Sequence, residues 1–205
     1  MNIKICGITT MDDAVDAVTL GVDALGFIFY EKSPRYVAPE KAEQIIKALP
    51  PFVKVVGVFV NQSKAEIDEI ARRCFLDLIQ LHGDESPEFC SQMIRRVLKA
   101  FKVAELDDLS GIAAYRDVVS GVLLDTKIPN MEGGTGKTFD WGLALRAKNV
   151  GVPVVLAGGI NSSNVKKAIQ LVNPYAIDLS SGVESSPGKK DYNKMQEMVK
   201  IAKTM

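Results

Sequence analysis

Short apolar runs alternate with amphipathic stretches along the whole chain. The runs are rich in valine, isoleucine, leucine and phenylalanine, as in VKVVGVFV at 53–60, and the stretches between them have helical spacing. The apolar runs predict strands at 2–6, 23–29, 53–60, 77–81, 97–103, 118–124, 153–157 and 175–180. The amphipathic stretches predict helices at 11–20, 39–48, 63–73, 86–96, 106–116, 140–148, 162–172 and 191–203.

This order of elements indicates an α/β protein with a parallel sheet. Strict alternation fits crossover connections, and near-continuous apolar strands fit a sheet covered on both faces. A doubly wound open sheet usually has a GxGxxG fingerprint after its first strand, but here Cys6-Gly7-Ile8-Thr9 follows. Without a linker to divide the chain, eight units predict a single compact (β/α)₈ TIM barrel over residues 1–205, below the usual length of about 250.

Composition narrows the class of function. The chain has 25 Lys+Arg against 25 Asp+Glu, so no excess positive charge favours nucleic acid or a membrane surface. No apolar run approaches the roughly 18 residues of a membrane span. Three cysteines without a CxxC pattern indicate reduced thiols, so we expect a cytoplasmic protein. One histidine excludes a multi-histidine metal site.

In a barrel of this kind the active site lies at the carboxyl ends of the strands. The last two predicted strands end in Gly158-Gly159 and Ser180-Ser181-Gly182. Barrels commonly bind phosphate at this position, with a short extra helix that the stretch from Gly182 to Pro187 would supply here. The alternative is that these residues are ordinary turns. We expect a phosphorylated small molecule as substrate.

A glycine-rich loop at 131–138 resembles a P-loop only superficially. The glycine that a Walker motif needs falls at Met131, and the loop lies beyond the end of its strand. It is either a loop that closes on the substrate or an ordinary solvent loop.

Cys6 and Asp125 end the first and sixth predicted strands. A thiol at a strand end is a candidate general base, although a lone buried cysteine is more often a core residue. A carboxyl group at the end of VVSGVLL is costly to bury unless it is paired or used, although it is equally typical of a turn. If both are functional, they flank the substrate as base and acid.

His82 and Arg35 are less specific signals. His82 either contacts the substrate or makes a hydrogen bond across the mouth of the barrel. Arg35 has the guanidinium fork that binds carboxylates, but an arginine in a loop is more often solvated.

Eight segments in order resemble the phosphoribosylanthranilate isomerase family over the whole chain. They are KICGIT (4–9), GFIFYEKSPRYV (26–37), GVFVN (57–61), QLHGDE (80–85), LLDTK (123–127), GGTGKTFDW (133–141), LAGGIN (156–161) and DLSSGVESSPGKKD (178–191). The resemblance implies an aldose–ketose isomerase of tryptophan biosynthesis. It would convert N-(5'-phosphoribosyl)anthranilate to 1-(2-carboxyphenylamino)-1-deoxyribulose 5-phosphate by an Amadori rearrangement without cofactor or metal.

The same resemblance assigns roles to residues. It implies that Cys6 is the general base and Asp125 the general acid, so the Asp125 carboxyl should have a pKa raised by burial and the Cys6 thiolate should be favoured. It also implies that Arg35 binds the anthranilate carboxylate. Further substrate-binding residues would be His82, Asp178, Gly158, Gly159, Ser180, Ser181 and Gly182.

Other functions are also compatible with the sequence. An indole-forming synthase is expected to use a lysine as its acid, and the histidine-pathway isomerase pairs two aspartates, a pair that Cys6 breaks. A non-catalytic barrel that binds phosphorylated ligands is the alternative from another class. Both a monomer and a homodimer are compatible with the sequence.

Overall fold

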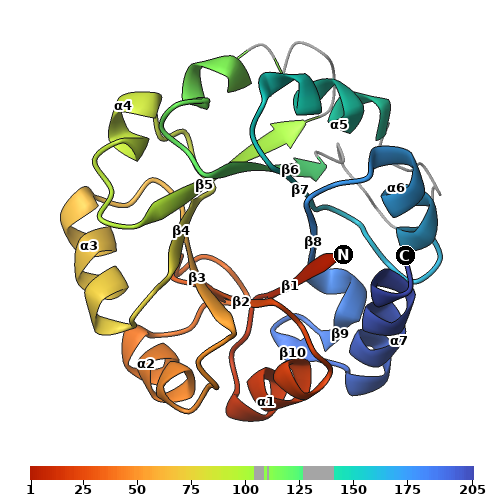
Figure 1. Ribbon diagram of the computed structural model, residues 1–205. Coiled ribbons are helices and arrows are strands. Elements are labelled where there is room, and N and C mark those ends of the chain that lie inside the picture. The colour runs from red at the N-terminus through yellow and green to blue at the C-terminus, as the bar shows by residue number, and fades with distance from the viewer. Residues whose placement is uncertain (104–108, 110, 127–140) are drawn as a thin grey trace.

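Eight parallel strands close into a barrel in the computed structural model, which describes residues 1–103, 109, 111–126 and 141–205. Each strand pairs with the next along the chain, and the eighth pairs with the first. The strands form the inner ring of Figure 1. They are β1 (Asn2–Cys6), β2 (Ala24–Ile28), β3 (Lys54–Phe59), β4 (Leu78–Leu81), β5 (Arg96–Val103), β6 (Gly121–Thr126), β7 (Val154–Leu156) and β8 (Ala176–Leu179). The predicted (β/α)₈ barrel is confirmed.

Helices surround this ring and cover its outer face (Figure 1). The α-helices are α1 (Met11–Thr19), α2 (Pro39–Lys47), α3 (Lys64–Arg73), α4 (Pro87–Cys90), α5 (Trp141–Ala147), α6 (Val165–Val172) and α7 (Tyr192–Lys203). Local sequence fixes several of their starts. The Ser63 hydroxyl accepts from the Glu66 N–H while the Glu66 carboxylate accepts from the Ser63 N–H, a capping box that begins α3. No described helix is long and apolar enough to cross a membrane.

Two predicted elements differ from the structure in length and position. The helix predicted at 86–96 is only α4, because Arg96 already pairs with Leu78 as the first residue of β5. The sixth strand begins at Gly121 rather than 118 and extends through Asp125, which pairs with Lys102 of β5. Residues 118–120 belong instead to the connection between a 3₁₀ helix and this strand.

That 3₁₀ helix, η2 (Ile112–Tyr115), is what the structure describes of the helix predicted at 106–116. Residues 104–108 and 110 lie outside the described part of the chain, as do the glycine-rich loop at 131–138 and Asp140 at the start of the helix predicted at 140–148.

The segment between β8 and α7 also differs from the prediction. A 3₁₀ helix, η4, spans only Ser181–Val183, and a small antiparallel hairpin of β9 (Glu184–Ser186) and β10 (Lys189–Lys190) replaces the rest of the helix expected from Gly182 to Pro187. Two hydrogen bonds connect this hairpin to the last residue of β1 and to the loop that follows it. The Thr9 hydroxyl donates to the Gly188 carbonyl at 2.6 Å, and Lys190 Nζ donates to the Cys6 carbonyl at 2.6 Å.

The apolar core has two layers. The larger lies between the strands and the helices, and a smaller one fills the inside of the barrel. The inner layer consists of Leu98, Ala100, Leu123, Val155, Ala157 and Ala176, which come from β5 to β8 or directly follow β7. The polar side chains of Lys4 (β1), Gln80 (β4) and Asp178 (β8) are buried as well, and Lys4 donates to the other two.

Candidate active site

A cavity of about 400 Å³ opens at the carboxyl ends of the strands. All ten residues that the sequence singles out line it, although they come from six separate parts of the chain. They are Cys6, Arg35, His82, Asp125, Gly158, Gly159, Asp178, Ser180, Ser181 and Gly182. The barrel therefore brings together the residues that the sequence analysis could only place at separate strand ends.

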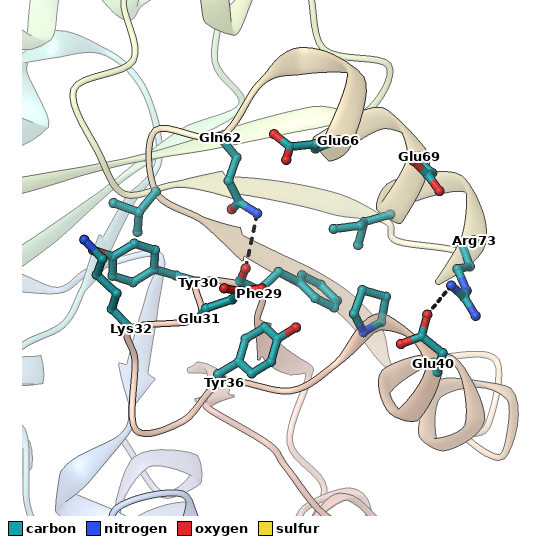
Figure 2. Close-up of a pocket in the computed structure, with 13 residues that line it drawn as sticks. Phe29, Tyr30, Glu31, Lys32, Tyr36, Glu40, Gln62, Glu66, Glu69 and Arg73 are labelled. Carbon is teal, nitrogen blue, oxygen red and sulfur yellow. Dashed lines mark hydrogen bonds and ion pairs between the residues drawn. The ribbon is translucent and has the colours of Figure 1, made fainter.

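A larger cavity of about 510 Å³ lies elsewhere, between the loop after β2 and helix α3. Figure 2 shows the aromatic rings of Phe29, Tyr30 and Tyr36 among its lining residues, with Arg73 and Glu40 paired at one end. Gln62 donates to the Phe29 carbonyl at 3.2 Å within it. None of the ten candidate residues lines this larger cavity. We therefore place the active site in the smaller cavity, which all ten line.

Cys6 is the last residue of β1 and only 6% exposed. Lys4 lies on the same face of the strand, because side chains two residues apart share a face. Both fit beside Gly26 of β2, where an added Cβ would lie 2.9 Å from Cys6 Sγ and 3.0 Å from Lys4 Cε. Burial raises the pKa of the Cys6 thiol, and the positive charges of Lys4 and Lys190 only partly offset it. The thiolate that the proposed role needs must therefore form against the cost of burial.

Lys4 is held inside the barrel by two partners. Its Nζ lies 2.9 Å from Gln80 Oε1 and 2.9 Å from Asp178 Oδ2. Lys4 and Asp178 are direct neighbours in the pairing of β1 with β8, and both side chains are less than a tenth exposed. Burial alone would lower the pKa of Lys4, but the Asp178 carboxylate and Cys6 outweigh it and the net pKa is raised. Burial also raises the pKa of Asp178, against the opposing charge of Lys4.

Asp125 faces His82 across the mouth of the barrel. Asp125 Oδ2 lies 3.3 Å from His82 Nε2, and the other ring nitrogen, Nδ1, lies 3.2 Å from Gln80 Nε2. The Asp125 side chain is 34% exposed, so the burial that we expected for the acid is not found. His82 thus makes a contact across the mouth of the barrel and also lines the cavity.

Arg35 is already paired with a carboxylate. Its Nε and Nη2 donate to the two oxygens of Glu184 at 2.8 and 2.7 Å, a bidentate pair that does not use Nη1, and the residue lines the cavity. Lys190 Nζ donates to Glu184 at 2.8 Å as well. Burial raises the pKa of Glu184, but its hydrogen bonds to Arg35 and Lys190 outweigh this and the net pKa is lowered.

Glycines shape the two loops on the other side of the cavity. Gly158 and Gly159 adopt φ angles of 77° and 63°, which side chains other than glycine seldom tolerate. A Cβ at Gly182 would collide with the Ile160 carbonyl, so the loops after β7 and β8 pack directly on each other. This arrangement presents backbone rather than side chains to the cavity.

Four further residues contact the candidate site residues and were not predicted from the sequence. Lys4 and Gln80 lie two residues before Cys6 and His82, so the two-residue period of a strand was the signal that could have found them. Glu184 and Lys190 belong to the hairpin where we expected a short helix from Gly182 to Pro187, and no local signal predicts that Glu184 pairs with Arg35 and with Lys190.

A parallel barrel with polar side chains gathered at its carboxyl end, and with glycine and serine loops after its last two strands, defines a (β/α)₈-barrel enzyme of the kind that acts on phosphorylated small molecules. The chain belongs to the N-(5'-phosphoribosyl)anthranilate (PRA) isomerase family, whose model matches residues 3–201.

Individual relatives are similar over their full length. The N-(5'-phosphoribosyl)anthranilate isomerase of Geobacter metallireducens is 53% identical over 203 residues, which is 99% of each chain. A phosphoribosylanthranilate isomerase crystallised with reduced 1-(o-carboxyphenylamino)-1-deoxyribulose 5-phosphate matches with a TM-score of 0.91 and 42% identity over 100% of each chain. A structure of mutually generated monomers of the dimeric Thermotoga maritima enzyme gives 0.90 and 42% over the same coverage.

Proposed function

We propose that this chain, as one barrel over residues 1–205, isomerises N-(5'-phosphoribosyl)anthranilate to 1-(2-carboxyphenylamino)-1-deoxyribulose 5-phosphate. The observation that carries the proposal is that Cys6 and Asp125, from strands on different sides of the barrel, line one cavity together with the glycine and serine loops. The reaction is an intramolecular aldose–ketose conversion in tryptophan biosynthesis. It needs one acid and one base, and we assign no cofactor or metal to it.

Asp125 is the general acid in this proposal. It gives its proton to the furanose ring oxygen, the bond from C1 to that oxygen breaks, and the nitrogen lone pair forms the C1 iminium ion. The exposure of Asp125 to the cavity places its carboxyl group where a substrate can reach it.

Cys6 is the general base. Its thiolate removes the proton from C2, and the electron pair moves to neutralise the iminium nitrogen, giving an enolamine that tautomerises to the ketone. Since burial raises the pKa of Cys6, the thiolate is a strong base once formed, and Lys4 and Lys190 are the cations that stabilise it.

The remaining cavity residues hold the two ends of the substrate. Arg35, oriented by Glu184, offers its free Nη1 edge to the anthranilate carboxylate. The backbone at Gly158, Gly159, Ser180, Ser181 and Gly182 is suited to the phosphate, because amides without bulky side chains approach an anion closely. His82 and Asp178 complete the pocket wall.

Rival activities fit this cavity less well. An indole-forming synthase is expected to use a lysine acid, and the described lining contains no lysine. A barrel that only binds phosphorylated ligands does not explain a buried thiol and a carboxyl group facing one space. The test is the decay of anthranilate-type fluorescence after addition of freshly made phosphoribosylanthranilate. We expect enzyme-dependent decay, and no turnover by the wild type would exclude the isomerase.

We also propose a homodimer. Phe52, in the loop from α2 to β3, is 95% exposed at the amino-terminal face of the barrel. The same face has a cavity of about 300 Å³ whose apolar lining includes Leu78, Leu98 and Val155. Phe52 of one copy fits this cavity in a second copy, and burying an aromatic side chain is strongly favourable.

The compartment is a further proposal. Base catalysis by Cys6 requires a reduced thiol, and the three cysteines are free. We therefore propose that the enzyme works in the cytoplasm.

A further inference from the structure

A row of polar contacts crosses the barrel along the active-site cavity, from Asp178 on β8 to Asp125 on β6. Asp178 Oδ2 and Gln80 Oε1 each lie 2.9 Å from Lys4 Nζ. At the other end of the Gln80 amide, Nε2 lies 3.2 Å from His82 Nδ1, and His82 Nε2 lies 3.3 Å from Asp125 Oδ2. The row thus connects an ion pair inside the barrel to the proposed acid.

The donor and the acceptor of each hydrogen bond in the row can be assigned. The Lys4 ammonium only donates hydrogen bonds, so the Gln80 atom that faces it must be the carbonyl oxygen. The raised pKa of Lys4 agrees with an ammonium at this position. The Gln80 NH₂ group therefore faces His82, and because it too only donates, the ring nitrogen it meets must accept. A neutral imidazole that accepts at Nδ1 carries its proton on Nε2, the nitrogen that faces Asp125.

We propose that Lys4 and Gln80 are positioning residues that hold His82 as the Nε2–H tautomer, so that His82 donates to Oδ2 of Asp125 and the proton for catalysis stays on Oδ1. This inference rests on the proposed function, in which Asp125 is the acid. It adds to the reaction two residues that act through His82: Lys4, which does not line the cavity, and Gln80, which lines it with its amide held between Lys4 and His82.

The tautomer decides where the acid keeps its proton. With the proton on Nε2, His82 occupies Oδ2 as a donor, and a protonated Asp125 must carry its hydrogen on the other oxygen. With the proton on Nδ1, the bare Nε2 would accept the hydrogen of Asp125 and hold it away from the substrate. An unfavourable N–H to N–H contact with Gln80 would arise at the same time.

The fold keeps the row rigid. Gln80 is 1% exposed and its backbone pairs with Val58 of β3. The His82 N–H donates to the Phe59 carbonyl at 2.9 Å, which fixes the backbone from which the ring projects. Gln80 and His82 share the inner face of β4 and its carboxyl-terminal extension, and this places the amide and the ring end to end.

The chain has a single histidine, so one imidazole gives all the signals in a long-range ¹H–¹⁵N spectrum of the ¹⁵N-labelled enzyme. For the wild type without substrate, at a pH where the ring is neutral, we expect the Nε2–H pattern, with a pyrrole-type shift at Nε2 and a pyridine-type shift at Nδ1. An Nδ1–H pattern would overturn the inference. The spectrum needs no turnover, so it fails or succeeds separately from the proposed function.

Gln80→Glu tests the positioning role, because it is nearly isosteric and replaces the donor that faces Nδ1 with an acceptor. We expect Nδ1 to become protonated and kcat to fall about tenfold or more with a change in KM below about threefold. Gln92→Glu makes the same change on an exposed turn and should leave the tautomer and kcat unchanged.

Two kinetic results would count against the role. An altered tautomer in Gln80→Glu with normal kcat would overturn it, and so would an inactive wild type, which would also remove the proposed function. If Gln80→Glu does not fold, the wild-type spectrum still decides whether the row sets the tautomer.

Discussion

Cys6 has surroundings that oppose its proposed role in the resting enzyme. Burial raises the pKa of the thiol, while Lys4 and Lys190 act in the opposite direction. The thiolate is the base, so it is lost as the pH falls, and kcat/KM should rise with pH until the thiol is fully ionised. Lys4 and Lys190 should then lower the pH at which the thiolate forms.

Lys4→Met removes one of these cations while keeping a side chain of similar length. We expect the thiolate to lose stabilisation, so the rising limb of the kcat/KM profile moves to higher pH by about one unit or more. Lys54→Met, which removes an exposed charge at the opposite face, is the control. Overlapping pH profiles for Lys4→Met and the wild type would contradict the role of Lys4.

The three cysteines should differ in reactivity. Burial raises the pKa of Cys74 and of Cys90 to about 11, and neither lines the active-site cavity. Cys6 does line it, so iodoacetamide should alkylate Cys6 first in the folded enzyme, and a reduced product analogue should slow this. Peptide mass spectrometry over time measures the order. Equal rates at the three sites would show that the cavity does not expose Cys6.

At the scale of single elements, the sequence predicts strands well because buried parallel strands are continuous apolar runs. The ends of these runs mark the carboxyl ends of the strands, where a barrel has its active site. Cys6 and Asp125 could be predicted as site residues on this ground. Lys4 and Gln80 were missed because they lie within such runs, where a polar residue looks like an interruption. Only the two-residue period, counted back from Cys6 and His82, would have placed them inside the barrel.

The β9–β10 hairpin carries a prediction of its own, because it holds Glu184 against Arg35. Glu184→Gln weakens the bidentate pair and leaves Lys190 without its carboxylate. Hydrogen bonds to charged groups contribute about 1.5–3 kcal/mol, so we expect KM to rise about tenfold or more with a smaller change in kcat. Ser185→Ala on the same hairpin is the control, and an unchanged KM in steady-state kinetics would refute the orienting role of Glu184.

At the scale of the whole molecule, barrel closure creates contacts that no local pattern contains. Arg35 meets Glu184 from 149 positions away, and Lys4 meets Asp178 from 174. The eight-unit count predicts the barrel, but not which side chains pair across it. The side-chain pairs of the site are far apart in sequence, so they could not be predicted from local patterns. The periodicity of apolar residues was sufficient to predict the fold.

Self-association is a property at this same scale. If Phe52 docks into a second copy, Phe52→Glu should convert a dimer into a monomer, because a glutamate cannot replace the apolar contacts of the ring with Leu78, Leu98 and Val155. Leu171→Glu places the same charge on an exposed position of α6 and should leave the dimer intact. Sedimentation velocity at several concentrations measures this. A wild type that sediments as a monomer throughout would remove the proposed dimer.

The most direct test of the central claim compares kcat for Cys6→Ala and Asp125→Asn with that of the wild type on phosphoribosylanthranilate. Loss of the base or of the acid should each reduce kcat by on the order of 10²-fold or more, with smaller effects on KM, because proton transfer rather than binding is lost. Circular dichroism should show that both variants keep the fold. A kcat near the wild-type value in either variant would contradict the assignment of that residue, and near-normal values in both would contradict the account of the site.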